Sequence, residues 1–237
     1  MKIHPQLILS LAILITSCTA QIKPIGESPL QLKSLDLNLK ITDLLPDKYK
    51  SKQFDDYYDI PSDSAHTNLL KKEIIFKDPY SDKKTPKWIE YHQQGSSSVD
   101  TMAVFDKFVF NTMNIVTTPD NKLMVFNGLI DEVGKKENDD FIRMLDGLYG
   151  NHVKTKGEFA KNTFDIYTWK LSDRTIKYAV VYDDESNTMK IEVDKVNNTI
   201  QNAAKEPHYQ GYIYIIDKAH EKEVVGQMGR GDLIFCK

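Results

Sequence analysis

The chain has 237 residues, of which 41% are hydrophobic and 27% are charged, and its formal net charge is −3. This slightly acidic balance argues against a nucleic-acid partner, because a phosphate backbone requires a basic protein face. A chain of this length buries about 70% of its unfolded surface, so a core can form without disulfide bonds.

An apolar run from Leu7 to Ile15 follows the basic Lys2 and is interrupted only by Ser10. As a helix, the run would cover about 14 Å, whereas the hydrocarbon core of a bilayer is about 30 Å thick. The run is therefore too short to span a membrane. A basic start followed by a short apolar run is typical of a secretory signal peptide.

The apolar run ends on the tetrapeptide Ile15-Thr16-Ser17-Cys18, which resembles the lipobox of bacterial lipoproteins. The resemblance implies that residues 1–17 are removed, that the Cys18 sulfur carries a diacylglyceryl group, and that the new α-amine is acylated. Three acyl chains hold a protein on a membrane far more firmly than one. The resemblance thus implies lipid attachment at Cys18 and location at the cell envelope, on the outer membrane of a Gram-negative bacterium.

The segment after the lipobox is expected to be a tether, and the globular region to follow it. Residues 18–31 carry two prolines and a glycine without sustained periodicity, as flexible linkers do. The globular region then occupies residues 32–237. Apolar and polar residues alternate from Leu35 to Ile41, which predicts a strand with one solvated face, and Leu45-Pro46-Asp47 ends it.

Residues 47–101 mix short apolar pieces with charged and proline-bearing stretches and give no clear assignment. The best candidate for an internal linker is Gln93–Ser98, which has the sequence QQGSSS. A loop and a domain boundary both fit this composition. The globular region is therefore either undivided or divided near residues 93–101.

A β-hairpin is predicted between Phe105 and Ile130. The apolar stretches 105–116 and 122–130 flank residues 117–121, whose proline and Asx residues suit a turn.

A helix is predicted next. Asn138-Asp139-Asp140 would cap its start, Phe141, Leu145 and Leu148 would share one face with Met144, and Gly150 would end it.

Three further strands are predicted as a meander over residues 164–171, 176–183 and 188–194, and two more over residues 211–217 and 233–237. Together these elements predict an α+β fold, in which an antiparallel sheet has at least one helix packed on one face.

No residue pattern in the chain matches a catalytic, cofactor or metal site. The histidines after Cys18 lack the spacing of helical metal ligands, and the G-x-S-x-G nucleophile motif is absent. These histidines are His66, His92, His152, His208 and His220. We therefore predict no catalytic residue, no cofactor and no metal ligand, and expect each histidine to be individually dispensable.

Two features near the C-terminus could carry chemistry but have simpler explanations. The segment from Gly226 to Asp232, GQMGRGD, is glycine-rich, yet phosphate loops lead into a helix and here a strand is expected. A hairpin loop is the better interpretation. Cys236 lacks a partner if Cys18 carries lipid, and it fits a small apolar residue of the last strand.

Tyrosines recur along the predicted strands, as at Tyr178, Tyr212 and Tyr214. They suit a binding face, but sheet packing is the more frequent role of such residues.

Two classes of function fit the sequence. The first is a lipid-anchored binding or interaction lipoprotein of the cell envelope, with a protein or glycan partner and contact with the membrane through its lipid. The second is a membrane-tethered hydrolase whose residues meet only in the folded chain. We favour the first because catalytic signatures are absent. A pocket that gathers two or more of His92, His152, His208 and carboxylates would favour the second.

The lipobox makes a direct prediction for Cys18. Replacement of this residue, Cys18→Ala, should leave the chain unprocessed and without acyl label, because the acceptor sulfur is lost. Metabolic labelling with a fatty acid measures the effect, and Cys236→Ala serves as the control that keeps the label. Label on the Cys18→Ala chain would show that the assignment is wrong.

Overall fold

The computed structural model describes residues 23–61, 68–77, 80, 82–95, 100–185, 191–194, 199–202 and 204–237. The predicted signal peptide and Cys18 lie outside these residues, as does His66. Within the described part of the chain, no helix is long and apolar enough to cross a membrane.

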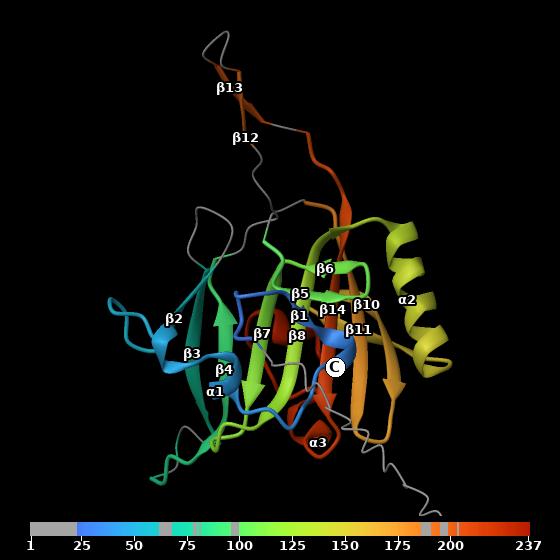
Figure 1. Cartoon of the computed structure of the whole chain (residues 1–237). Helices are drawn as coiled ribbons and strands as arrows, with labels where there is room; N and C mark the ends of the chain where they lie inside the picture. Colours follow the sequence, from blue (N-terminus) through green and yellow to red (C-terminus); the bar gives the residue numbers. More distant parts are fainter. Residues whose placement is uncertain are drawn as a thin grey trace, which may run out of the picture.

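The fold is built on a nine-stranded sheet in which every neighbouring pair is antiparallel, in the order β2-β3-β4-β7-β8-β14-β11-β10-β9 (Figure 1). Its strands are β2 Tyr57–Ile60, β3 Asn68–Phe76, β4 Pro86–Gln93, β7 Thr112–Thr117, β8 Leu123–Val133, β14 His208–Asp217, β11 Arg174–Asp183, β10 Asn162–Lys170 and β9 Val153–Phe159.

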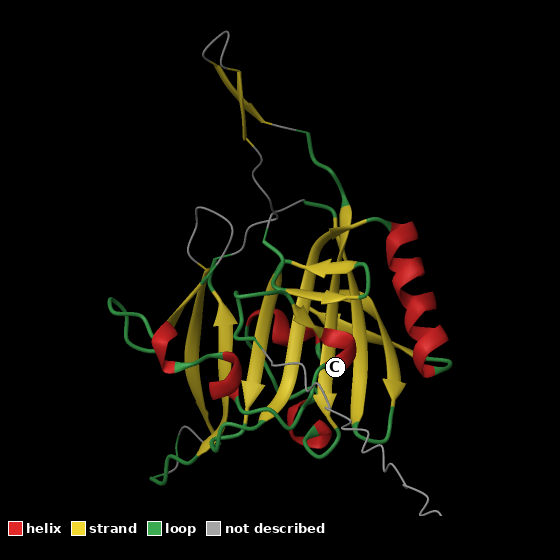
Figure 2. Ribbon diagram, in the orientation of Figure 1, coloured by secondary structure: helices red, strands yellow, loops and turns green. Residues whose placement is uncertain are grey.

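Two smaller sheets and a few short helices complete the described residues. The smaller sheets combine β1 Leu30–Gln31, β5 Ala103–Phe105 and β6 Phe108–Phe110, and separately β12 Ile191–Asp194 and β13 Thr199–Asn202. The helices are α1 Ile41–Leu44, α2 Lys135–Tyr149 and α3 Glu221–Val224, with 3-10 turns η1 Leu32–Ser34, η2 Asp47–Tyr49 and η3 Gly231–Phe235. Figure 2 shows α2 as the longest of them.

The two faces of the large sheet are covered by opposite ends of the described chain. On one face, here called the α2 face, Phe141 and Leu145 pack in a core that also holds Ile25 and Leu32 of the N-terminal segment. The ring centroid of Phe141 lies 4.7 Å from that of Tyr178 on β11. On the other face, here called the C-terminal face, Leu233 packs in a second core with Val224 of α3.

The predicted antiparallel sheet with a helix on one face is confirmed, but the α+β description gives the helices too much weight. Among the described residues, α2 has 15 residues, whereas α1 and α3 have four each. The fold is mainly β. Strands β4 and β7, on either side of the candidate linker, pair directly in the same sheet.

The described part of the expected tether, residues 23–31, contacts the domain. Ile25 is 1% exposed, its backbone N–H donates to Leu44 O at 2.9 Å, and β1 pairs with β5. An apolar residue here lowers the free energy of the fold by leaving water, so these residues are part of the packed structure.

The strand predicted from Leu35 to Ile41 is wrong, although Leu35, Leu37 and Ile41 are buried as the alternation implied. The Asp36 carboxylate accepts a hydrogen bond from the Asn38 backbone N–H at 2.9 Å. Such a local side-chain bond turns the chain and competes with a strand ladder. Helix α1 then begins at Ile41.

The hairpin prediction is confirmed from residue 112 onward by the pairing of β7 with β8, and the positive φ of Asn121, 70°, fits the turn between them. Residues 105–110 instead lie in β5, β6 and the turn between them, in a smaller sheet. Helix α2 ends before Gly150, which has φ of 84° as predicted. The prediction placed the start of this helix too late, because the N-cap is Gly134 and not Asn138. Asn138 is buried and accepts a hydrogen bond from the Tyr178 hydroxyl.

The meander prediction is right for β10 and β11. Residues 191–194 form a strand as predicted, β12, but this strand does not continue the meander. Strand β11 pairs with β14 over its full length, from Arg174 with Asp217 to Asp183 with His208. Strand β12 pairs instead with β13, apart from the large sheet. Residues 188–190 lie outside the described chain.

The last predicted strand, residues 233–237, is also wrong. The chain forms the 3-10 turn η3 here, and Leu233 and Cys236, three positions apart, are both buried. A 3-10 turn has three residues per turn, so this spacing directs both side chains to the sheet.

Two leucines on α2 test the assigned packing. Leu145→Ala should lower the free energy of unfolding by about 2–5 kcal/mol, because the side chain is fully buried. Leu148→Ala should cost less than about 1 kcal/mol, because Leu148 is 41% exposed, contrary to the prediction that it faces the sheet. Denaturant melts measure both, and equal losses would contradict the assigned face.

Candidate functional site

A row of polar residues crosses the C-terminal face of the large sheet. In the strand register Lys71 is opposite His92, His92 opposite Asn114, and Asn114 opposite Asn127, and the row continues to Tyr214, Lys177 and Thr168. All members after Lys71 are buried. Directly opposed residues point to the same face, so these side chains form one continuous polar row within a mostly apolar layer.

The C-terminal segment, residues 230–237, lies on this polar row and is bound to it by hydrogen bonds. The Tyr214 hydroxyl donates to the Asp232 carbonyl at 2.6 Å, and Lys177 Nζ donates to the Lys237 carbonyl at 2.7 Å. Asn114 Nδ2 lies 3.0 Å from Asp232 Oδ2 and 2.8 Å from Asn127 Oδ1. Buried polar groups need such partners, so the segment and the row satisfy one another.

A buried glutamate and histidine lie side by side on β4 within this face. His92 Nε2 is 2.9 Å from Glu90 Oε2, and Trp88 Nε1 donates to Glu90 Oε1 at 2.7 Å. Glu90 is 1% exposed and His92 8%. The three side chains share a face because residues two apart in a strand point the same way.

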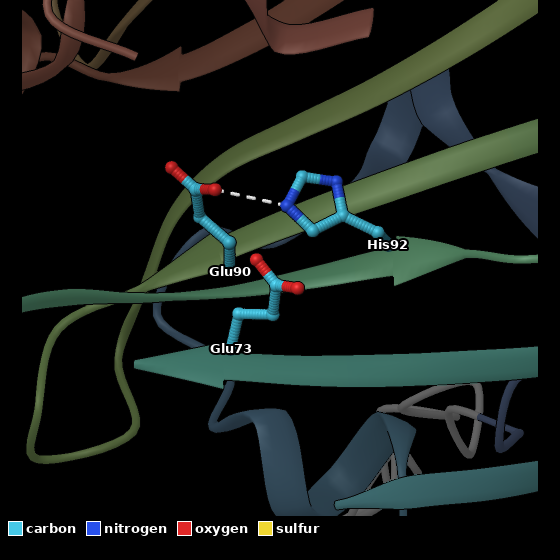
Figure 3. Close-up of side chains that lie close together, drawn as sticks. All are labelled: Glu73, Glu90 and His92. Atoms are coloured by element: carbon cyan, nitrogen blue, oxygen red, sulfur yellow. Dashed lines mark hydrogen bonds and ion pairs between the residues drawn. The ribbon is translucent and has the colours of Figure 1, made fainter. Parts of the chain in front are cut away.

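Glu73 of β3 reaches the same place from the neighbouring strand, where it is the register partner of Glu90. Figure 3 shows Glu73, Glu90 and His92 close together, with a dashed line for the contact between Glu90 and His92. Lys71 Nζ lies 2.8 Å from Glu73 Oε1, and Arg230 forms a second ion pair with Glu73.

A pocket of about 340 Å³ opens between β3, β4, β7 and the start of the C-terminal segment. Its lining residues are all polar or charged except a glycine: Glu73, His92, Gln93, Gln94, Asn114, Arg230, Gly231 and Asp232. Small-molecule pockets are mostly apolar. A lining of this kind therefore favours a hydrophilic ligand.

The two carboxyl groups of the pocket are shifted in opposite directions. The hydrogen bond from Lys71 lowers the pKa of Glu73, and Arg230 contributes to the same shift. Burial raises the pKa of Asp232, while the hydrogen bond from Asn114 opposes this effect. Two acids with different proton affinities thus face one small volume.

Of the described histidines, His92 alone lines this pocket. His152 Nδ1 lies 2.9 Å from Asp146, His208 Nδ1 lies 3.6 Å from Glu185, and His220 Nδ1 lies 3.4 Å from Glu223. The spacing of metal ligands on a helix could not indicate this cluster, because His92 meets Glu90 along its own strand and Glu73 across to the next strand. The alternation Trp88-x-Glu90-x-His92 was the signal that could have indicated a shared face.

The glycine-rich segment from Gly226 to Asp232 also has a different setting from the one predicted. It leads into η3 and not into a strand, and three of its residues, Arg230, Gly231 and Asp232, line the pocket.

Three of the strand tyrosines serve packing as predicted, since Tyr178, Tyr212 and Tyr214 are at most 3% exposed, whereas Tyr182 is 56% exposed.

Comparisons with protein-family models, with curated proteins and with solved structures found no match.

The buried Cys236 tests whether the C-terminal segment stays closed. Burial raises the pKa of this thiol to about 12, and the thiolate is the reactive form. In a Cys18→Ser chain, where Cys236 is the remaining thiol, labelling by a disulfide reagent at pH 8 should be orders of magnitude slower in the native state than in denaturant. Rapid native labelling would show that the segment detaches from the polar row.

Proposed function

We propose that this protein is a lipid-anchored binding lipoprotein of the cell envelope that takes a small hydrophilic ligand in the pocket between Glu73, His92 and Asp232. The observation that carries the proposal is the lining of the pocket, in which every side chain is polar or charged. Such side chains would cost free energy if they were merely buried, and they recognise a ligand through directed hydrogen bonds.

The anchor is inferred from the N-terminal sequence. The lipobox-like Ile15-Thr16-Ser17-Cys18 follows a run too short to span a bilayer. Lipid on Cys18 would hold the domain at the outer membrane of a Gram-negative bacterium.

The charges of the pocket favour a ligand that offers hydrogen-bond donors or positive charge. Glu73 and Asp232 face the pocket, and the buried Glu90 lies behind His92. Arg230 and Lys71 both pair with Glu73, whereas Asp232 accepts a hydrogen bond from the Asn114 amide through Oδ2 and has no cation as a partner among the described contacts. Hydroxyl-rich and amine-bearing molecules, such as glycan units or polar peptide groups, meet this requirement.

A membrane-tethered hydrolase is the second candidate, and the pairing of His92 with Glu90 favours it. A histidine held by a buried carboxylate is the arrangement of a general base. His92 also shares a pocket with the carboxylates of Glu73 and Asp232, as expected from the sequence for a hydrolase. Among the lining residues that the structure describes, there is no hydroxyl or thiol side chain. A hydrolase of this kind would therefore activate water directly.

Ligand screening by thermal unfolding tests the binding proposal. The detergent-solubilised protein is mixed with sugars, amino acids, short peptides and polyamines, and a true ligand should raise Tm. At 100 times its Kd a ligand adds about 2.7 kcal/mol of stability. The shift should be lost in Arg230→Ala and in His92→Gln, because both residues line the pocket.

The controls are substitutions of the same residue types on another part of the domain, Arg143→Ala and His152→Gln, which should keep the shift. A ligand whose Tm shift persists in the pocket variants would place binding elsewhere and contradict the proposal. If a screened compound is instead hydrolysed, and Glu90→Gln abolishes turnover, the second candidate replaces the first.

A further inference from the structure

We propose that Glu73, Glu90 and His92 form a binding site for a divalent transition-metal ion at the inner end of the pocket. This inference deepens the proposed function, because the ion would occupy part of the same pocket and help to hold the ligand. It assigns ligands that no sequence motif indicated.

The geometry of the three side chains is close to that of a metal site. Their candidate ligand atoms all lie within 4.8 Å of one another, and His92 Nε2 and Glu90 Oε2 are 2.9 Å apart. Ligand atoms around a tetrahedral zinc ion at about 2.0–2.2 Å are roughly 3.5 Å apart. Figure 3 shows the Glu73 carboxyl group beside Glu90 and His92, so a movement of this side chain toward the other two would complete the set.

The electrostatics of the pair of glutamates also favour a bound cation. Glu73 and Glu90 are direct register partners on adjacent strands, and like charges in that position repel. Glu90 is 1% exposed, so water screens this repulsion weakly. A divalent ion between the two carboxylates would turn the repulsion into shared coordination.

Arg230 would compete with a metal ion for the Glu73 carboxylate. It pairs with Glu73 from the C-terminal segment, and its own side chain is 59% exposed. An exposed, flexible arginine can move into solvent at little cost. Release of Arg230 would free a Glu73 oxygen, so metal binding exchanges one positive charge for another.

The surroundings hold the remaining ligands in place. Trp88 Nε1 donates to Glu90 Oε1, which leaves Oε2 directed at His92 and at the ion. Partners of this kind orient the ligands of a metal site. Three protein ligands leave positions open toward the pocket, where water or a ligand atom can bind. Two carboxylates and one imidazole suit zinc or manganese.

Titration of the full-length, detergent-solubilised protein with Zn²⁺, and separately with Mn²⁺, tests the site by calorimetry. One ion should bind per chain. The variants His92→Asn and Glu73→Gln should each weaken binding at least about 10-fold. The matched controls are His152→Asn, from another histidine–carboxylate pair, and Glu221→Gln, from another partly buried glutamate paired with a lysine, and neither should change the affinity.

Arg230→Ala is expected to change the metal affinity in the opposite direction. The Arg230 side chain is exposed, so its loss should leave the core intact. This variant should bind the ion more tightly than the wild type, because the competing cation is gone. Absence of stoichiometric binding by both ions, equal affinity in His92→Asn, or weaker binding in Arg230→Ala would each overturn the proposal.

The outcome is separable from that of the ligand screen. A chain that binds no ion but is stabilised by a pocket ligand keeps the proposed function and loses the metal site. A chain that binds the ion but no screened ligand keeps the metal site alone.

Discussion

The attachment of the C-terminal segment to the polar row is the interaction on which the described structure depends. The row crosses a face that is mostly apolar, and its buried amides, hydroxyls and ammonium need partners. The backbone carbonyls of Asp232 and Lys237 and the side chain of Asp232 supply them. The same segment brings Leu233 and Cys236 onto the apolar residues beside the row. Polar and apolar contacts together therefore hold residues 230–237 in a single position on the sheet.

The pocket follows from this attachment, because the segment both covers the sheet and lines the site. Where η3 begins, Arg230 and Asp232 reach past the covered part of the face toward β3 and β4. Glu73 and His92 face them from those strands. A hydrophilic site thus lies at the margin of a hydrophobic layer, where charged groups keep partial contact with water while their partners are held by the sheet. The proposed ligand and metal sites both use this boundary.

The sequence predicted those parts of the fold whose signals are local. The hairpin between β7 and β8 has alternating strands and a turn with suitable residues, and α2 ends at a glycine as expected. Strand β9 was missed because it is an edge strand with mostly exposed, charged side chains. The candidate site could be predicted only in part. Glu90 and His92 share a face by strand alternation, but Glu73 and Arg230 join them through register and through the path of the C-terminus, which no local pattern records.

The covering segment follows every strand of the large sheet in chain order, and this order has a consequence for folding. The face that it covers stays open until residues 230–237 are available, so a chain that has formed only the strands of the sheet displays that face to solvent. Open apolar sheet faces promote aggregation in partly folded chains. Here the polar row divides the face and remains hydrated until Asp232 and Lys237 bind to it. The buried polar groups that make the finished site also keep the unfinished sheet amphipathic, and thereby limit its association with other incomplete chains.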